Sequence, residues 1–354
     1  MRGMCCVLGF LVATTAAAAQ QAALDVLVDA EAWETDAGSR LLARNEGRLA
    51  FLGRLHAWGT VRFAPAWELV AMGEVEGASG EEEVEVGIEE LVLRYFPSRA
   101  LHVEGGKLLT PLGGFAARGF SNLNPLIGKP DGYSDAYPWG VVAAGAAGPF
   151  DYRAGLVSLP GADPDYMPEA GHTLRPIVGA GWSAGPAFRV GMGVTHGPYL
   201  GPDVQDSLPV GAEWRDFRET IVALDARYSG GYAVLRGELA WAVYDVPTLV
   251  DPVHSMGGYV EALLTLTPRL FAAARLERYR YARVRPEGAP TWRGTETTQQ
   301  NGEVGVGYRL GPGTVVKLSY RLDHWPDDPS DDGHALAVQL SQWVDVGGVF
   351  AGRR

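Results

Sequence analysis

The sequence predicts an all-β protein, a closed antiparallel transmembrane β-barrel of about sixteen strands with short periplasmic turns and long external loops. Three observations predict this fold. Segments in which polar and apolar residues alternate recur along the chain, and a period of two is typical of β-strands. Their number is even, and short connections alternate with long ones. A membrane barrel sorts its turns in this way, whereas a soluble sandwich has no reason to do so.

Composition excludes several other classes of protein. The chain has 354 residues, of which 47% are hydrophobic and 20% charged, so it is neither disordered nor a helical membrane protein. Its formal net charge is -12. A nucleic-acid-binding protein needs a basic surface to neutralise phosphates, so we expect no nucleic-acid partner.

The N-terminus reads as a secretory signal peptide at residues 1–19. It has the positive charge of Arg2, an apolar run at 7–12 and an A-x-A cleavage site at 17–19. Both cysteines lie within it, so we expect the remaining domain, 20–354, to lack disulfides. No later segment is apolar enough for a membrane helix, so a membrane crossing would require a β-barrel.

Two hairpins show the alternation and set the expected register. In the first, Gly230-Gly231 is a two-residue turn signal, and pairing across it places Asp225 opposite Arg236. In the second, a three-residue loop at 311–313 places Glu303 opposite Arg321. Opposite charges facing each other across a strand pair support both registers.

The same pattern defines the other strands in order. We expect strands at 24–33, 48–59, 65–77, 83–95, 99–109, 139–147, 150–159, 176–184, 187–196, 217–229, 232–244, 256–267, 270–281, 300–310, 314–324 and 334–346. The alternation slips near Glu89-Glu90, where a β-bulge would absorb one residue. The long connections are 110–138, 160–175, 197–216, 245–255, 282–299 and 325–333.

The environment decides which strand face points outward. In a membrane barrel the outward face must be apolar, so the charged faces should line the lumen. The expected lumenal residues are Arg54, Glu74, Glu85, Arg189, Arg227, Arg236, Glu238, Glu303, Arg309, Lys317 and Arg321. Aromatic residues near strand ends fit interfacial girdles, with ordinary packing or the lumen as the alternative for each. They are Trp58, Trp67, Tyr95, Tyr228, Trp241, Tyr320 and Trp343.

The longest connection, 110–138, is the third external loop counted from a periplasmic N-terminus. At this position the chain resembles sixteen-stranded Gram-negative outer-membrane porins, in which a loop folds inward and narrows the pore. Residues 106–113 read GKLLTPLG, which resembles the G-K-x-x-x-P-x-G motif of phosphate-selective porins and related proteins. The chain has only three lysines, which departs from a lysine-rich phosphate path. If the loop folds inward, its charges available to the constriction are Arg118, Lys129, Asp131 and Asp135; the alternative is a plain surface loop.

These features predict a porin of the cell outer membrane that conducts small hydrophilic solutes or ions with weak charge selectivity. Acidic external segments favour a mild cation preference. Expected partners are outer-membrane lipid and lipopolysaccharide, and the resemblance implies a homotrimer. The alternatives are a non-conducting structural or adhesive barrel and a secreted soluble β-protein.

The sequence predicts no catalytic residue, cofactor or metal. Asp323-His324 and His102 are the tempting catalytic candidates, but no serine motif or metal-spaced histidine pair accompanies them. A partial calcium-loop pattern from Asp328 to Gly333 lacks the glutamate expected at its twelfth position.

Overall fold

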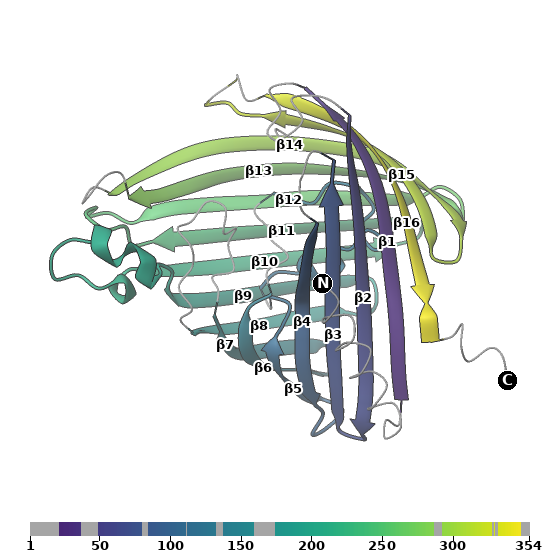
Figure 1. Ribbon diagram of the computed structural model, residues 1–354, viewed down its shortest axis with the longest axis horizontal. Coiled ribbons are helices and arrows are strands. Elements are labelled where there is room, and N and C mark those ends of the chain that lie inside the picture. The colour runs from purple at the N-terminus through teal and green to yellow at the C-terminus, as the bar shows by residue number, and fades with distance from the viewer. Residues whose placement is uncertain are drawn as a thin grey trace.

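The chain folds into one closed barrel of sixteen antiparallel strands, in which every strand pairs with its sequence neighbours and β16 pairs with β1 (Figure 1). The computed structural model describes residues 21–36, 49–79, 84–110, 112–131, 137–158, 174–286, 292–327, 329 and 332–347. Within these ranges, no helix is long and apolar enough to cross a membrane. The predicted fold class and strand number are confirmed.

The strands are β1 (Gln21–Thr35), β2 (Ala50–Ala64), β3 (Trp67–Ala78), β4 (Glu85–Tyr95), β5 (Leu101–Lys107), β6 (Trp139–Ala147), β7 (Phe150–Val157), β8 (Arg175–Ala184), β9 (Phe188–Pro198), β10 (Arg218–Gly230), β11 (Ala233–Tyr244), β12 (Val253–Thr265), β13 (Leu270–Pro286), β14 (Trp292–Gly311), β15 (Thr314–His324) and β16 (Gly333–Asp345). Short 3-10 helices lie in two connections: η2 (Ala116–Arg118), η4 (Pro202–Ser207) and η5 (Trp214–Asp216).

The largest error in the predicted strands concerns the hairpin of β13 and β14. We expected 282–299 to be a long connection, but both strands continue through it and remain paired from Ala282↔Glu296 to Pro286↔Trp292. The residues of this extension are mostly polar or charged. A strand that extends beyond the apolar outer surface of the barrel no longer alternates hydrophobic and polar residues. The sequence pattern therefore ends before the backbone pairing of the two strands ends.

The register of the first hairpin was also predicted incorrectly. Asp225 pairs with Glu238, not with Arg236, because the two turn residues are Gly231 and Tyr232. Gly231 has a φ of 58°, which suits the left-handed first position of such a turn. The shift moves each partner by two residues, so every side chain keeps its predicted face.

Two other details of the ladder agree with the sequence. Glu303 lies opposite Arg321, as the three-residue loop predicted. The bulge near Glu89 is present as well, because Met72 pairs with Glu90 while the next residue, Gly73, pairs with Ile88. The extra residue changes the phase of β4, so its outward residues are even-numbered before the bulge and odd-numbered after it.

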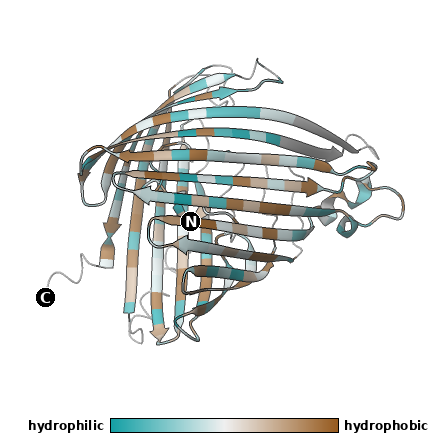
Figure 2. Cartoon of the chain, turned by 180° about the vertical axis from the view of Figure 1, so that it is seen from behind, coloured by the Kyte–Doolittle hydropathy of each residue, from teal (hydrophilic) through white to brown (hydrophobic). Residues whose placement is uncertain are grey.

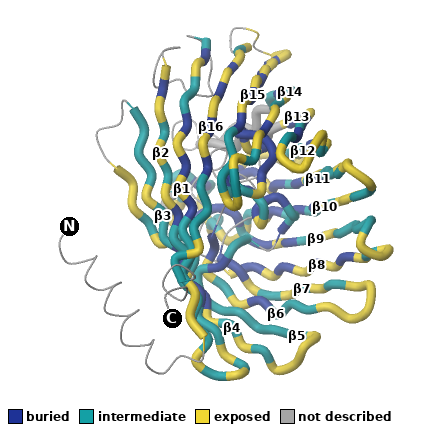
Figure 3. Tube along the Cα trace, turned by 90° about the vertical axis from the view of Figure 1, so that its right-hand side faces the viewer, coloured by how far each residue is buried: buried dark blue, intermediate teal, exposed yellow. Residues whose placement is uncertain are grey.

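Burial in this barrel is inverted relative to a globular protein. Along β11, outward Leu235 and Leu239 are 48% and 42% exposed, whereas inward Glu238 is 8% exposed. The same alternation of buried and exposed positions runs along the neighbouring strands (Figure 3), and hydrophobic and hydrophilic residues alternate with it (Figure 2). Apolar residues therefore cover the outer face, as a barrel in hydrocarbon requires.

The structure separates the aromatic residues into two groups. Five of them project outward and are exposed: Trp67, Tyr95, Tyr228, Trp241 and Tyr320. Trp58 and Trp343 instead share the inward face of the ladder, and their ring centroids lie 5.1 Å apart. These two tryptophans belong to the lumen and not to an interfacial girdle.

An apolar cluster also lies on the inward side of the wall. It joins inward residues of β4, β6–β8, β10 and β11, such as Val142 and Ile221, to Tyr199, Leu200 and Leu208 of the β9–β10 connection. These loop residues are buried against the strands. Packing of this connection therefore fills part of the lumen beside β6–β11.

Candidate functional site in the barrel lumen

The third external loop folds into the barrel. Residues 112–131 of this loop contact inward side chains of β11, β1 and β16. The Gly114 N–H donates to Glu238 of β11 at 3.0 Å. Ser121 Oγ lies 2.5 Å from Asp29 Oδ1 of β1 and 2.7 Å from Ser341 Oγ of β16. The described part of this loop is thus an inward loop and not a surface loop.

Lys317 of β15 holds the middle of the loop by its backbone oxygens. Its Nζ donates to the carbonyls of Ser121, Asn124 and Leu126 at 2.5, 2.7 and 3.3 Å, and to Gln339 Oε1 of β16 at 2.9 Å. The lysine is only 2% exposed. We had expected it to line water, but the loop covers it and replaces water as its hydrogen-bond partner.

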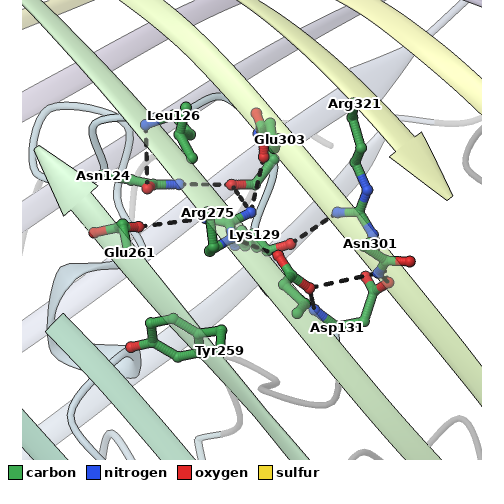
Figure 4. Close-up of polar contacts among 12 residues, drawn as sticks. Asn124, Leu126, Lys129, Asp131, Tyr259, Glu261, Arg275, Asn301, Glu303 and Arg321 are labelled. Atoms are coloured by element: carbon green, nitrogen blue, oxygen red, sulfur yellow. Dashed lines mark hydrogen bonds and ion pairs between the residues drawn. The ribbon is translucent and has the colours of Figure 1, made fainter.

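Glu303 of β14 holds the next residues of the loop by their backbone amides. Its Oε1 accepts from Ile127 N at 3.2 Å and from Gly128 N at 3.0 Å. Arg275 of β13 donates to Gly128 O at 2.9 Å and to Glu303 Oε2 at 2.8 Å (Figure 4). Gly128 leaves room for this contact, since a Cβ there would lie 2.6 Å from Glu303 Oε2.

Asp131 anchors the far end of the described loop. Its carboxylate accepts from Arg321 Nη2 of β15 at 2.5 Å and from Asn301 Nδ2 at 2.5 Å, and its own N–H donates to Glu277 of β13 at 3.1 Å. Arg321 also donates to Lys129 O at 3.1 Å (Figure 4). Arg321 is 3% exposed, so this predicted pore-lining arginine is buried under the loop as well.

Arg118 anchors the first part of the loop on β12. Its Nη1 donates to Glu261 at 3.0 Å and its Nη2 to the Tyr259 hydroxyl at 2.6 Å, and Tyr259 donates to Glu238 at 2.6 Å. Arg236 donates to the same carboxylate of Glu261 at 3.1 Å. Arg118 is therefore tied to the wall by charge-assisted hydrogen bonds, which are stronger and more directional than neutral ones.

Between the loop and the wall formed by β1–β4 lies a polar cavity of about 240 Å³. Four carboxylates line it, those of Asp29, Glu74, Glu76 and Glu89. Its cationic side chains are Arg54 and Lys129, and Arg54 forms ion pairs with Glu74 at 3.0 Å and Glu76 at 2.5 Å. His56, Phe120 and Tyr137 complete the lining together with Gly119 and Ser121.

The remaining predicted residues lie apart from this cavity. Arg189 and Arg227 face inward from β9 and β10, where Arg189 pairs with Asp151 at 2.8 Å and also with Asp225. Arg309 lies over the Phe271 ring, with its guanidinium carbon 4.8 Å from the ring centroid. Glu85 pairs in register with Glu76 at the start of β4. Asp135 lies outside the described residues.

Several residues of the site were missed by the sequence reasoning. Glu261, Arg275 and Glu277 lie on the inward faces of the strands predicted at 256–267 and 270–281, and extending the alternation along those segments would have found them. His56 is inward by the same alternation. Phe120 carries no periodic signal, because it belongs to an irregular loop whose path depends on tertiary contacts.

A second buried network lies near the β9–β10 connection. Arg175 of β8 and Glu219 of β10 are both fully buried and paired at 2.5 Å, and Arg175 also donates to Thr195 at 3.0 Å. Nearby, burial raises the pKa of the Tyr199 hydroxyl well above its usual range. The hydroxyl therefore stays protonated and donates to Asp245 O at 2.9 Å.

The described residues contain no group of three or more His, Cys, Asp or Glu side chains placed to hold a metal ion. Asp328 and Ser330 of the partial calcium pattern lie outside the described part of the chain. His324, the catalytic candidate beside Asp323, contacts Asp332 at 2.8 Å through Nδ1. Hydrogen bonds from Trp325 N and His324 lower the pKa of the Asp332 carboxyl. His324 is therefore part of an exposed hydrogen-bonded pair with Asp332.

Comparison with solved structures places the chain in the fold of sixteen-stranded outer-membrane porins. A loop-L8 deletion mutant of OmpT from Vibrio cholerae matches with a TM-score of 0.62 and 12% identity, covering 92% of this chain and 99% of that one. The trimer form of in-vitro folded OmpT matches with a TM-score of 0.59 and 11% identity, covering 92% and 99%. An anion-selective porin from Comamonas acidovorans matches with a TM-score of 0.62 and 11% identity, covering 92% and 99%. No protein-family model and no curated protein matches the sequence.

Proposed function

We propose that the protein is an outer-membrane porin, a passive channel through which small hydrophilic solutes or ions diffuse across the lumen. The observation that carries this proposal is the inverted barrel, with an apolar exterior and charged side chains inside it. The loop 112–131 narrows the lumen. In this proposal solutes pass by diffusion, and no covalent bond is made or broken. Passage would follow the polar cavity between this loop and β1–β4.

Channel activity is tested by adding purified protein to a planar lipid bilayer. We expect stepwise increases in ionic current as single channels insert. Bilayers that stay silent although the protein has folded and inserted would contradict the proposal and favour a structural or adhesive barrel. Recovery of the folded protein in the aqueous fraction without detergent would favour a soluble β-protein instead.

The cavity supports a mild preference for cations. Four carboxylates face it, against the cationic Arg54 and Lys129, and a surplus of fixed negative charge at a narrow point enriches cations. Anion preference is the second candidate, because Arg227 lies directly beside Arg189 and Arg236 in the lumenal register. The reversal potential across a salt gradient distinguishes the two by its sign.

The proposed partners are outer-membrane lipid, lipopolysaccharide and further copies of the chain. On β13, Arg278 and Arg280 are exposed on the outward face beyond the apolar Leu276, where they would meet the anionic headgroups of a membrane surface. The similarity to OmpT, which has a trimer form, supports a homotrimer. Chemical cross-linking in native membranes tests it, and a monomer band alone would contradict it.

A further inference from the structure

An aromatic cluster lies inside the barrel next to the polar cavity. Trp58 of β2 lies 5.1 Å from Trp343 of β16 and 5.0 Å from Phe120 of the inward loop, measured between ring centroids. His56 joins them, 5.5 Å from Trp58 and 5.2 Å from Phe120. The side chains of Trp58, Phe120 and Trp343 are half-buried, so each keeps accessible surface within the lumen.

This cluster is continuous with the acidic cavity. His56 and Phe120 belong to both, and Asp29, Glu74, Glu76 and Glu89 line the same space. Arg54 is held by two of these carboxylates, and Lys129 is the second cationic side chain in the lining. A solute in the cavity therefore meets the Phe120 ring and a surplus of carboxylates. Trp58 packs against Phe120, and Trp343 packs against Trp58, so the aromatic surface continues beyond the cavity.

Packing accounts for only one side of these aromatic residues. Leu27 of β1 pairs in register with Trp343, and Met72 of β3 pairs with Trp58. Leu27 and Met72 are fully buried, whereas the indoles keep accessible surface near the carboxylates. Aromatic faces carry negative electrostatic potential and attract cations, most strongly when the cation is weakly hydrated. Small inorganic cations keep their hydration shells, whereas organic ammonium ions present methyl or methylene groups that can contact a ring directly.

We propose that the lumen contains a binding subsite for organic ammonium ions, formed by Trp58, Phe120 and Trp343 beside the carboxylates of the cavity. The subsite rests on the proposed channel function and adds a class of solute to it. The rings contact the alkylated nitrogen, and the carboxylates supply the opposite charge. The cavity that Phe120 shares with these carboxylates has a volume of about 240 Å³, which accommodates a small ion of this class together with water.

The test measures the ionic current of wild-type channels in potassium chloride while choline chloride is added. Sodium chloride at equal ionic strength is the control for charge, and 3,3-dimethylbutan-1-ol, an uncharged molecule of similar shape, is the control for apolar contact. We expect choline to reduce the single-channel current or to cause brief closures, and both controls to leave the potassium current unobstructed. Equal effects of choline and sodium would overturn the subsite, and block by the neutral alcohol would show an apolar site instead.

Variants connect the effect to the aromatic cluster. Trp58→Leu with Trp343→Leu removes both indoles while keeping apolar side chains, and Phe120→Leu is a second, independent variant in the loop. We expect each to lose most of the choline block while the potassium current remains. Trp241→Leu on the outward face is the matched control and should keep the block. A choline block that survives the double variant and Phe120→Leu would refute this assignment while leaving the channel intact, whereas absent potassium currents in the wild type would refute the channel itself and the subsite with it.

Discussion

Lys317 shows how single inward residues of this barrel hold a loop in place of water. Its Nζ reaches the carbonyl of Ser121, which lies 196 positions earlier in the chain, and two further carbonyls. Glu303 complements it by accepting from backbone amides. Together the two side chains provide hydrogen-bond partners for backbone N–H and C=O groups of an irregular segment. The described part of this segment does not pair with a strand that could supply such partners.

Replacing Lys317 with methionine should release the inward loop. The change leaves buried carbonyl oxygens without a donor, and each such group costs about 1–3 kcal/mol. We expect a larger single-channel conductance and greater open-channel noise in bilayer recordings. Arg309→Met is the control, because it removes one lumenal charge at a residue that lies over Phe271. Equal noise in the two variants would show that the loop does not depend on Lys317.

The buried pair of Arg175 and Glu219 offers a test of stability. Removing one partner leaves an uncompensated charge in a fully buried place, which costs about 3–5 kcal/mol. Arg175→Met should therefore lower the free energy of unfolding by that amount in urea titrations of the folded barrel. The double variant Arg175→Met/Glu219→Met should recover most of the loss, because apolar pairs replace buried ion pairs at little cost. If the double variant is less stable than Arg175→Met, the unpaired charge of Glu219 is not the cause of the lower free energy of unfolding.

Residue faces were predictable from the sequence, but the partners of most charges were not. The pairing of Glu303 with Arg321 followed from a three-residue loop, because local turn length fixes register. The pairing of Asp225 was predicted incorrectly, since consecutive glycines allow more than one turn position. The contacts of Lys317 and Arg118 with distant elements leave no local pattern that a sequence could show.

At the scale of elements, the loop 112–131 is built from short pieces that different strands hold. Arg118 binds to β12, Ser121 to β1 and β16, and Asp131 to β13–β15. The inward position of such a loop was expected from the family resemblance and not from its residues. Its path inside the barrel could not be predicted, because the hydrogen bonds that fix it join residues far apart in sequence.

A disulfide tests the position of this loop directly. Ser121 Oγ and Ser341 Oγ lie 2.7 Å apart, so the variant Ser121→Cys/Ser341→Cys places two thiols close together and should form a cross-link. The only native cysteines are Cys5 and Cys6, so protein prepared as residues 20–354 contains no other thiol. Mass spectrometry of a proteolytic digest should identify the linked peptides.

The matched control pairs Ser121→Cys with Ser183→Cys. Ser183 lies on β8, on the other side of the strand order from β16, so no cross-link is expected. Failure of Ser121→Cys/Ser341→Cys to oxidise in the folded protein would place the loop away from β16 and would contradict the description of the lumen.

At the scale of the whole molecule, the feature that supports a membrane barrel is that apolar side chains point outward and charged side chains point inward. The parity of loop lengths and the period of two were enough to predict sixteen strands, because a closed sheet between two sides of a membrane imposes both patterns. The extension of β13 and β14 and the apolar cluster beside β6–β11 were not predicted. The sequence of the extension lacks hydrophobic alternation although its strands stay paired. The cluster departs from the alternation because it places apolar side chains inside the barrel.

The central claim is that solutes cross the lumen along the cavity between the inward loop and β1–β4. Glu74 lines this cavity, and Glu74→Cys would supply the only thiol in protein prepared as residues 20–354. A positively charged methanethiosulfonate reagent, applied to open channels of this variant in a planar bilayer, should lower the current of each channel and weaken cation preference, while wild-type channels stay unchanged. Modification of the cysteine, verified by mass, with no change in current would contradict the account.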